Sequence, residues 1–514
     1  MREFKITRGR IVKPPAAQGF AAAAFRHRTS RAQDPHLHTH VVVANMTRAE
    51  DGTWLALDGD AILKTYRLAA GYLYEAQLRH ELTQRLGLSW TEPAKGMAEL
   101  EWVPEEAIRA FSSRRQALVE HMEAMGTDGF AASRVAALAT RERKEQVELP
   151  RLREEWKARA AEHGLGRREL TRLGRERPRL DVSAIDRDGL AERLLGPDGL
   201  TAKQTTFAMP ELAQAVAGSL REGAPIELVL EEAEELSRIP ALERLEQDAT
   251  PGRPARFTTR ELLAIERDAL QLALAGRDVD VPRPDKTIVA RLIMESGREL
   301  TGDQGMLVHE ASRRPGRVLC IAGAAGSGKT TALRVLAEAY REREVPVLGA
   351  APSGRAADEL QAATGVPSST LHRLLLDAHR EGGLPHGCVL LVDEAGMAET
   401  RVLAPVLELV ERAEGRAILV GDPHQLPPVG AGGLFPALCE RLGKIDLAHN
   451  RRQHDLSERK ALALLRGGDP HAYLAHAAKS GRLHLERDPT EAKQRLLEDW
   501  WQVAQHDLPG SVML

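Results

Sequence analysis

Residues 318–334 read Val-Leu-Cys-Ile-Ala-Gly-Ala-Ala-Gly-Ser-Gly-Lys-Thr-Thr-Ala-Leu-Arg. The apolar run Val318–Ala322 predicts a buried strand, and the glycine-rich stretch Gly323–Gly328 predicts a tight loop after it. An amphipathic helix is expected from Lys329 onward. This is the pattern G-x-x-x-x-G-K-[ST] in the strand–loop–helix setting that it requires. Its glycines let backbone N–H groups approach phosphate oxygens, so the stretch predicts a nucleotide site rather than an ordinary glycine-rich turn.

The residue types of this loop predict individual roles. Lys329 is expected to reach the β- and γ-phosphates of ATP, and Thr330 to hold Mg²⁺. Upstream, the two-faced amide of Gln304 is suited to an adenine edge, although an exposed loop glutamine is the alternative. The expected nucleotide-binding set is Gln304, Gly323, Ala324, Ala325, Gly326, Ser327, Gly328, Lys329, Thr330 and Thr331.

Acidic residues follow another apolar strand further along the chain. Cys388–Val392 ends in Asp393 and Glu394, which is the Walker B arrangement. Asp393 is expected to hold Mg²⁺, and Glu394 to orient or deprotonate the attacking water. The pair is weak evidence by itself, but it is strong evidence after a phosphate-binding loop.

Two later residues are candidates for sensing or stabilising the γ-phosphate. The strand Ala417–Val420 leads into a turn that contains Gln425, which we expect to sense that phosphate. Arg452 is expected to stabilise the transferred charge as an arginine finger does. The alternative is that Arg451 and Arg452 form only a basic patch.

Histidines are concentrated in the amino-terminal part of the chain. Two strand-like segments, residues 19–28 and 36–45, flank a polar turn. Strand periodicity places His38 and His40 on one face, and a hairpin would place His27 opposite them. Three imidazoles would suit Zn²⁺, Mn²⁺ or Mg²⁺, depending on the remaining ligands. A histidine-rich surface strand explains the spacing equally well.

The composition is that of a globular protein, and it excludes some classes. The chain has 514 residues, of which 43% are hydrophobic and 28% charged, with a formal net charge of −3. Nucleic-acid binding would therefore depend on local basic surfaces. Three widely separated cysteines form no metal-ligand pair and favour a reducing, cytoplasmic location. Because no apolar run approaches about 18 residues, we expect no membrane insertion.

The histidine segment resembles a known family signature. His27-Arg28-Thr29-Ser30-Arg31, followed by Asp34-Pro35-His36-Leu37-His38-Thr39-His40 and then Asn45, resembles the metal-binding motif of TrwC/TraI-type conjugative relaxases. Matched position by position, the resemblance implies that His27, His38 and His40 are metal ligands. In that family, the metal polarises a phosphate of the plasmid transfer origin and a tyrosine attacks it, which gives a covalent 5′-phosphotyrosine.

The carboxy-terminal motifs carry a second resemblance. Gln304, the phosphate-binding loop, residues 393–397, residues 421–428 and Arg452-Gln453 resemble the ordered motifs of superfamily 1B, RecD-like helicases. This group includes the helicase half of TrwC/TraI proteins. The resemblance implies an ATP-dependent motor that moves 5′ to 3′ on single-stranded DNA, and it makes the conjugation machinery a candidate partner.

Together the patterns predict an α/β chain in three parts. Residues 1–165 are expected to form a partial α+β relaxase domain with antiparallel strands, and residues 166–295 a helical connector. Residues 296–514 are expected to form a RecA-like parallel-sheet domain, the first helicase lobe. The family's nucleophilic tyrosines precede the first metal histidine, whereas no tyrosine precedes His27 here. We therefore expect loss of nicking, and we expect the second motor lobe to be missing.

Two other functions fit parts of the pattern. One is an independent RecD-like DNA-repair helicase with an unrelated front end, against which the histidines count. The other is a truncated product that binds DNA or nucleotide without turnover.

Overall fold

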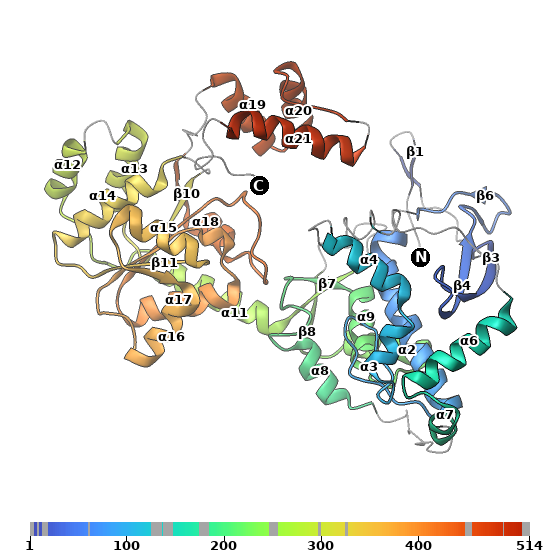
Figure 1. Ribbon diagram of the computed structural model, residues 1–514. Coiled ribbons are helices and arrows are strands. Elements are labelled where there is room, and N and C mark those ends of the chain that lie inside the picture. The colour runs from blue at the N-terminus through green and yellow to red at the C-terminus, as the bar shows by residue number, and fades with distance from the viewer. Residues whose placement is uncertain are drawn as a thin grey trace. The chain divides into compact units, whose positions relative to one another are not determined.

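The computed structural model divides the chain into two compact units, Met1–Leu263 and Ala264–Leu514, and we describe each by itself (Figure 1). The residues that the structure describes are 5–7, 10–12, 19–59, 62–124, 136, 148–173, 185–245, 255–296, 300–323, 327–447, 455–486 and 488–505.

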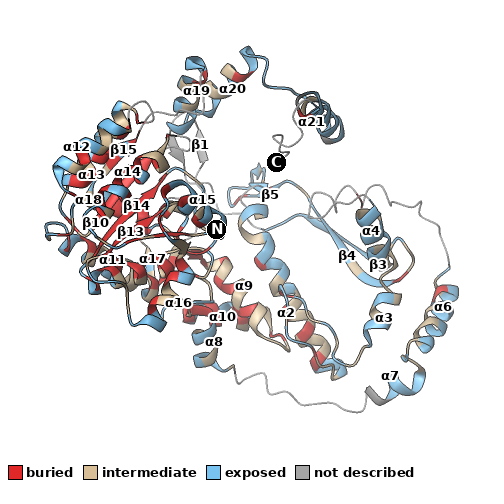
Figure 2. Cartoon of the chain, turned by 60° about the vertical axis from the view of Figure 1, so that its left-hand side comes forward, coloured by how far each residue is buried: buried red, intermediate tan, exposed pale blue. Residues whose placement is uncertain are grey.

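Antiparallel hairpins open the first unit. The one that carries the histidines pairs β3 with β4, in the register that the sequence predicts, with His27 opposite His38. Most residues of both strands are exposed, and Val41 is 60% exposed (Figure 2). The strands are β1 (Lys5–Thr7), β2 (Arg10–Val12), β3 (Ala22–Thr29), β4 (Pro35–Val43), β5 (Thr47–Arg48) and β6 (Trp54–Leu55).

Helices make up most of the remainder of the first unit. A three-stranded antiparallel sheet of order β7-β9-β8 lies where the sequence predicts only a helical connector. Its strands have two to four residues each, too few for a period to show. The elements are η1 (Ile62–Tyr66), α2 (Arg67–Leu86), α3 (Glu105–Ala110), α4 (Ser113–Ala124), α6 (Leu149–Glu162), α7 (Arg167–Leu173), α8 (Arg187–Leu195), β7 (Phe207–Ala208), α9 (Met209–Ser219), α10 (Ile226–Leu236), β8 (Leu242–Leu245) and β9 (Arg256–Thr259).

The core of the first unit forms where α9 packs against α2, α8 and α10. Ala76 of α2 is buried among Leu212 and Val216 of α9, and Tyr72 packs against the same cluster. The buried guanidinium of Arg79 donates to the backbone oxygens of Gly96, Ala217 and Leu220. Two of those carbonyls lie at the end of α9, where helical partners run out, so Arg79 supplies the missing donors.

The second unit is built on a six-stranded parallel sheet of order β12-β11-β13-β14-β10-β15, which confirms the predicted fold class. Its elements are α11 (Arg260–Ala275), whose start precedes the division, α12 (Lys286–Glu295), α13 (Gly302–Arg313), β10 (Val318–Gly323), α14 (Lys329–Arg341), β11 (Val347–Ala351), α15 (Gly354–Thr364), β12 (Ser368–Thr370), α16 (Leu371–Glu381), β13 (Val389–Val392), η4 (Ala395–Met397), α17 (Thr400–Arg412), β14 (Arg416–Gly421), α18 (Leu434–Leu442), β15 (Lys444–Leu447), α19 (Leu456–Arg466), α20 (Pro470–Lys479) and α21 (Pro489–Ala504).

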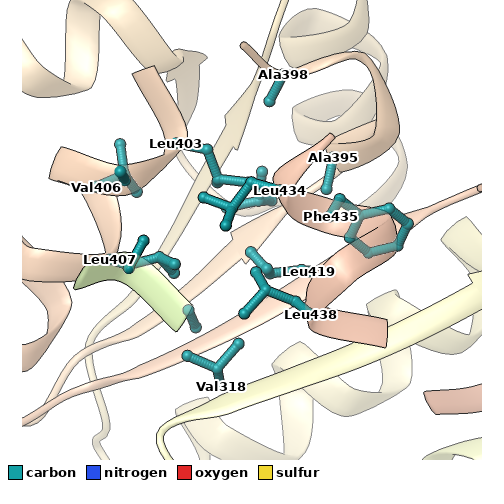
Figure 3. Close-up of a cluster of buried hydrophobic side chains, with 14 of the residues drawn as sticks. Val318, Ala395, Ala398, Leu403, Val406, Leu407, Leu419, Leu434, Phe435 and Leu438 are labelled. Carbon is teal, nitrogen blue, oxygen red and sulfur yellow. The ribbon is translucent and has the colours of Figure 1, made fainter. Parts of the chain in front are cut away.

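Alternate residues of each central strand serve two separate apolar cores. Val318 and Leu419 face a cluster formed with α17 and α18, to which Leu403 and Phe435 contribute (Figure 3). Leu319 and Ile321 face the opposite cluster, formed with α13, α14 and α15. Because both faces are covered, the strands are continuous apolar runs, as expected of a parallel sheet.

A buried arginine joins the start of β14 to α13 and α14. The guanidinium of Arg416 donates to the backbone oxygens of Ala311 and Arg314 and to the Tyr340 hydroxyl, at 2.8–3.2 Å. Arg416 is fully buried. Its N–H groups therefore provide these oxygens with the hydrogen bonds that water would otherwise provide.

We expect Arg416→Met to destabilise the protein by about 3 kcal/mol, because two buried acceptors and one partly buried acceptor lose their donor. Tyr340→Phe is the control, since it removes one of these hydrogen bonds and should cost about 1 kcal/mol. Urea unfolding followed by circular dichroism measures both changes. Equal losses in the two variants would contradict the role given to Arg416.

Candidate functional sites

Three histidines of the first unit meet on one face of the β3–β4 hairpin. The ring centroids of His27 and His38 lie 5.3 Å apart, those of His27 and His40 4.7 Å, and those of His38 and His40 4.9 Å. Each residue offers a ring nitrogen, and the three nitrogens lie within 4.8 Å of one another. The sequence places these imidazoles together through strand register alone, and their nitrogen donor set fits a divalent transition metal.

The backbone of the neighbouring residue fixes the tautomer of His38. Its Nδ1 lies 2.9 Å from the carbonyl oxygen of His36. A carbonyl only accepts, so Nδ1 carries the proton and Nε2 keeps a lone pair for a ligand. The His36 ring stacks on the His38 ring at 4.4 Å, but it is not part of the three-nitrogen cluster.

The phosphate-binding loop of the second unit lies between β10 and α14. Gly328 adopts a left-handed φ of 81° immediately before the helix, a conformation that favours glycine. Lys329 is 8% exposed, and its Nζ donates to the backbone oxygen of Gly323 at 2.9 Å. Thr330 and Thr331 are half-buried in the first turn of α14. Ala324, Ala325 and Gly326 lie outside the described residues.

Gln304 lies against this loop, and its amide is engaged. The side-chain oxygen accepts from the backbone N–H and hydroxyl of Thr301, which begins α13 with a capping box. Its Nε2 donates to the backbone oxygen of Gly328 at 2.9 Å. In this structure, therefore, Gln304 joins the start of α13 to the phosphate-binding loop.

Strand register brings the acidic residues to the same edge of the sheet as this loop. Ala322 pairs with Gly421, and Val392 pairs with Leu419. Burial raises the pKa of both Asp393 and Glu394, and the Lys329 ammonium partly opposes that rise. The Glu394 backbone N–H donates to Asp393 Oδ1 at 2.9 Å, which also lowers the pKa of Asp393.

Three polar atoms at this edge are buried without a hydrogen-bond partner among the residues that the structure describes. They are Ser327 Oγ, Glu394 Oε2 and Gln425 Oε1. A buried polar group without a partner is costly in free energy, so such groups mark a place where a ligand or water completes the bonding. Phosphate, Mg²⁺ and a water molecule fit these atoms. Arg452 lies outside the described residues.

A salt bridge that the sequence did not predict lies beside the loop. Both carboxylate oxygens of Asp422 lie 2.8 Å from Arg466, and the His424 backbone N–H also donates to Asp422. A cavity of about 600 Å³ adjoins it and is lined in part by Gly323, Lys444 and Lys460. Only the tertiary fold brings Arg466, near the end of α19, to Asp422, because no periodicity links them.

No described helix has both the length and the apolar composition needed to span a lipid bilayer.

In comparisons with known proteins, each of the two units matches a different family. The family model for the TrwC relaxase matches residues 2–163, and that for an AAA domain matches residues 299–488. The conjugal transfer protein TraA of Agrobacterium fabrum is 33% identical over 248 residues, which cover 48% of this chain and 22% of TraA. The multifunctional conjugation protein TraI of Escherichia coli is 43% identical over 144 residues, covering 26% and 8%.

Two further comparisons concern one part each. The RecBCD enzyme subunit RecD of Mycolicibacterium smegmatis is 38% identical over 208 residues, which cover 33% of this chain and 37% of RecD. A solved structure of the conjugative relaxase TrwC in complex with oriT DNA, in its metal-bound form, is 35% identical, with a TM-score of 0.29. It covers 32% of this chain and 57% of that chain. In the comparison with TraA, this chain spans about a fifth of the length of that relative.

We predict that Glu394→Gln stabilises the protein at pH 7. Burial raises the folded-state pKa of Glu394 above its ordinary value of 4.5, so the ionised carboxylate destabilises the folded state at neutral pH. That penalty disappears as pH falls through the folded-state pKa, because the protonated side chain resembles an amide in charge. The advantage of the variant, measured by urea unfolding, should shrink as the pH falls through the folded-state pKa and should be lost below pH 4.5. Glu381→Gln, at an exposed position, is the control.

Proposed function

We propose that this chain, in which a TrwC relaxase region precedes an AAA domain related to TraI and RecD, is part of a conjugative relaxase–helicase. In this proposal it binds and hydrolyses ATP on single-stranded DNA and binds transfer-origin DNA with a divalent metal. A cytoplasmic location and an association with the conjugation machinery belong to the same proposal. The observation that carries it is the presence of two built sites in one chain, the histidine cluster and the phosphate-binding edge of the sheet.

The second unit has groups suited to each part of ATP hydrolysis. Lys329 and the backbone amides at the start of α14 would hold the phosphates, while Thr330 and Asp393 would hold Mg²⁺. Glu394, whose pKa is raised by burial, would orient the attacking water and accept its proton. Gln425 and Arg452 would contact the γ-phosphate.

Gln304 supports this site through the loop rather than through a free amide. Its hydrogen bonds to Thr301 and Gly328 use both ends of the side chain. Contact with an adenine would require these bonds to be exchanged. We therefore include Gln304 as part of the nucleotide site through its effect on the position of Gly328.

The first unit has groups suited to a phosphate of DNA. A divalent metal held by His27, His38 and His40 supplies Lewis-acid polarisation of a phosphate oxygen. Three ligands leave positions open for that oxygen. The carbonyl of His36 keeps His38 in the tautomer whose Nε2 has a lone pair for the metal. The metal is Mg²⁺, Mn²⁺ or Zn²⁺ in this proposal.

Lys329→Ala should reduce ATP hydrolysis by about 100-fold or more, because the variant lacks a buried cation at the phosphates. Phosphate release in the presence of single-stranded DNA measures turnover, and a fluorescent ADP analogue measures binding. Lys479→Ala, at an exposed position of α20, is the control and should keep both properties. Turnover of Lys329→Ala at the wild-type rate would exclude the site. Binding without turnover in the wild type would favour a non-catalytic module.

His38→Ala should weaken Mn²⁺ or Zn²⁺ binding by more than about 100-fold, because it removes a direct ligand and outer-sphere changes typically cost about 10- to 100-fold. His36→Ala is the matched control, because it removes a neighbouring imidazole and keeps the carbonyl that orients His38. We expect less than about a tenfold change in that control. Isothermal titration calorimetry at pH 7.5 measures both affinities. Equal losses would show that no particular set of histidines binds the metal.

A further inference from the structure

A buried carboxylate lies in the turn of the histidine-bearing hairpin. Asp34 is 3% exposed, although the strands on either side of it are largely open to solvent. It follows β3 and directly precedes β4, in the turn that leads to His38 and His40. A charged group that is buried this deeply must be compensated by charge or hydrogen bonds.

Two helices provide that compensation. Asp34 Oδ2 accepts from the backbone N–H of Ser113, and Oδ1 accepts from the Ser113 hydroxyl, both at 3.0 Å. Oδ1 also accepts from Arg159 at 2.9 Å. Ser113 is the first residue of α4, so the carboxylate lies at a helix amino terminus, where the backbone dipole favours an anion. Arg159 belongs to α6, and this ion pair is largely shielded from solvent.

Neighbouring contacts hold the same turn. Trp156 of α6 donates its ring N–H to the backbone oxygen of Gln33, which has a left-handed φ of 63°. Arg159 also stacks over the Phe111 ring, with its guanidinium carbon 4.3 Å from the centroid. The contact with Phe111 therefore also restrains Arg159. The turn is fixed to α6 at two adjacent residues, Gln33 and Asp34.

The pairing of β3 with β4 contributes little stability to the hairpin by itself. β3 and β4 form a two-stranded sheet, and such hairpins are marginally stable alone. The register also shifts between His27 and Thr29, directly beside the turn. A slip of one residue would move His38 and His40 to the opposite face from His27. The contacts at the turn therefore oppose the displacement that would destroy the three-nitrogen cluster.

We propose that Asp34 is a positioning residue for the histidine cluster, which anchors the β3–β4 turn to α4 and α6 and so keeps His38 and His40 facing His27. This inference rests on the proposed metal role of that cluster. Asp34 does not contact the metal in this proposal. It acts by restricting the turn, so that the free energy of metal binding is not spent on ordering the ligands.

The test is a titration of the full chain with Co²⁺, whose d–d absorption reports ligand number and geometry. Asp34→Asn keeps the size of the side chain but places an amide N–H₂ group where three donors converge. We expect its Co²⁺ affinity to fall about 10- to 100-fold, with a changed spectrum. Asp34→Glu keeps the charge and should recover part of the affinity. Asp51→Asn, at an exposed turn where the carboxylate accepts from the backbone N–H and hydroxyl of Thr53, should match the wild type.

Each outcome has a definite meaning. Wild-type affinity and spectrum in Asp34→Asn, measured well below its melting temperature, would overturn the inference and leave the metal site intact. Failure of the wild-type chain to bind Co²⁺ would instead contradict the proposed metal function. If Asp34→Asn does not fold, Ser113→Ala decides, because it removes only the hydroxyl donor. A reduced affinity with an unchanged circular dichroism spectrum supports the inference, and an unchanged affinity overturns it.

Discussion

The carboxyl ends of β10, β13 and β14 must lie at one edge of a parallel sheet, and the second unit depends on this constraint. Parallel pairing places Gly421 beside Ala322, and Leu419 beside Val392. The residues that follow each strand therefore converge, although they are far apart in the chain. Apolar side chains on both faces fix this register, because a slip of one residue would exchange the side chains that face the two cores and disrupt the packing of both.

Buried polar groups differ in how their hydrogen bonds are completed. The terminal guanidinium nitrogens of Arg416 and Arg79 donate to backbone or hydroxyl oxygens and so stabilise the fold, while the Nε of each arginine has no partner among the described residues. Ser327, Glu394 and Gln425 instead keep buried polar atoms without partners in the described part of the chain. Terminal nitrogens that are bound within the fold are typical of structural arginines. Several unpartnered polar atoms at one sheet edge are typical of a site that a ligand completes.

The sequence predicted those features that follow from local pattern. Val318–Ala322 and the glycines after it predicted a strand and a phosphate-binding loop, and strand periodicity predicted that His27 lies opposite His38. The three-stranded sheet of the connector was missed, because strands this short carry no period. Asp34 belongs to the histidine motif of residues 27–45, but nothing in that motif indicated Ser113 or Arg159 as partners. The same holds for Asp422 and Arg466.

The sequence by itself determined which chemical groups are available and which of them share a strand, loop or helix turn, because those relations depend on periods of two and 3.6 residues. It predicted a phosphate-binding loop, an acidic strand end and a histidine hairpin. Only the tertiary structure decided which groups are left without partners, how Gln304 is engaged, and what anchors the hairpin turn. The contacts of Gln304 with Gly328 and of Asp34 with Arg159 join residues 24 and 125 positions apart, and packing rather than local pattern sets them.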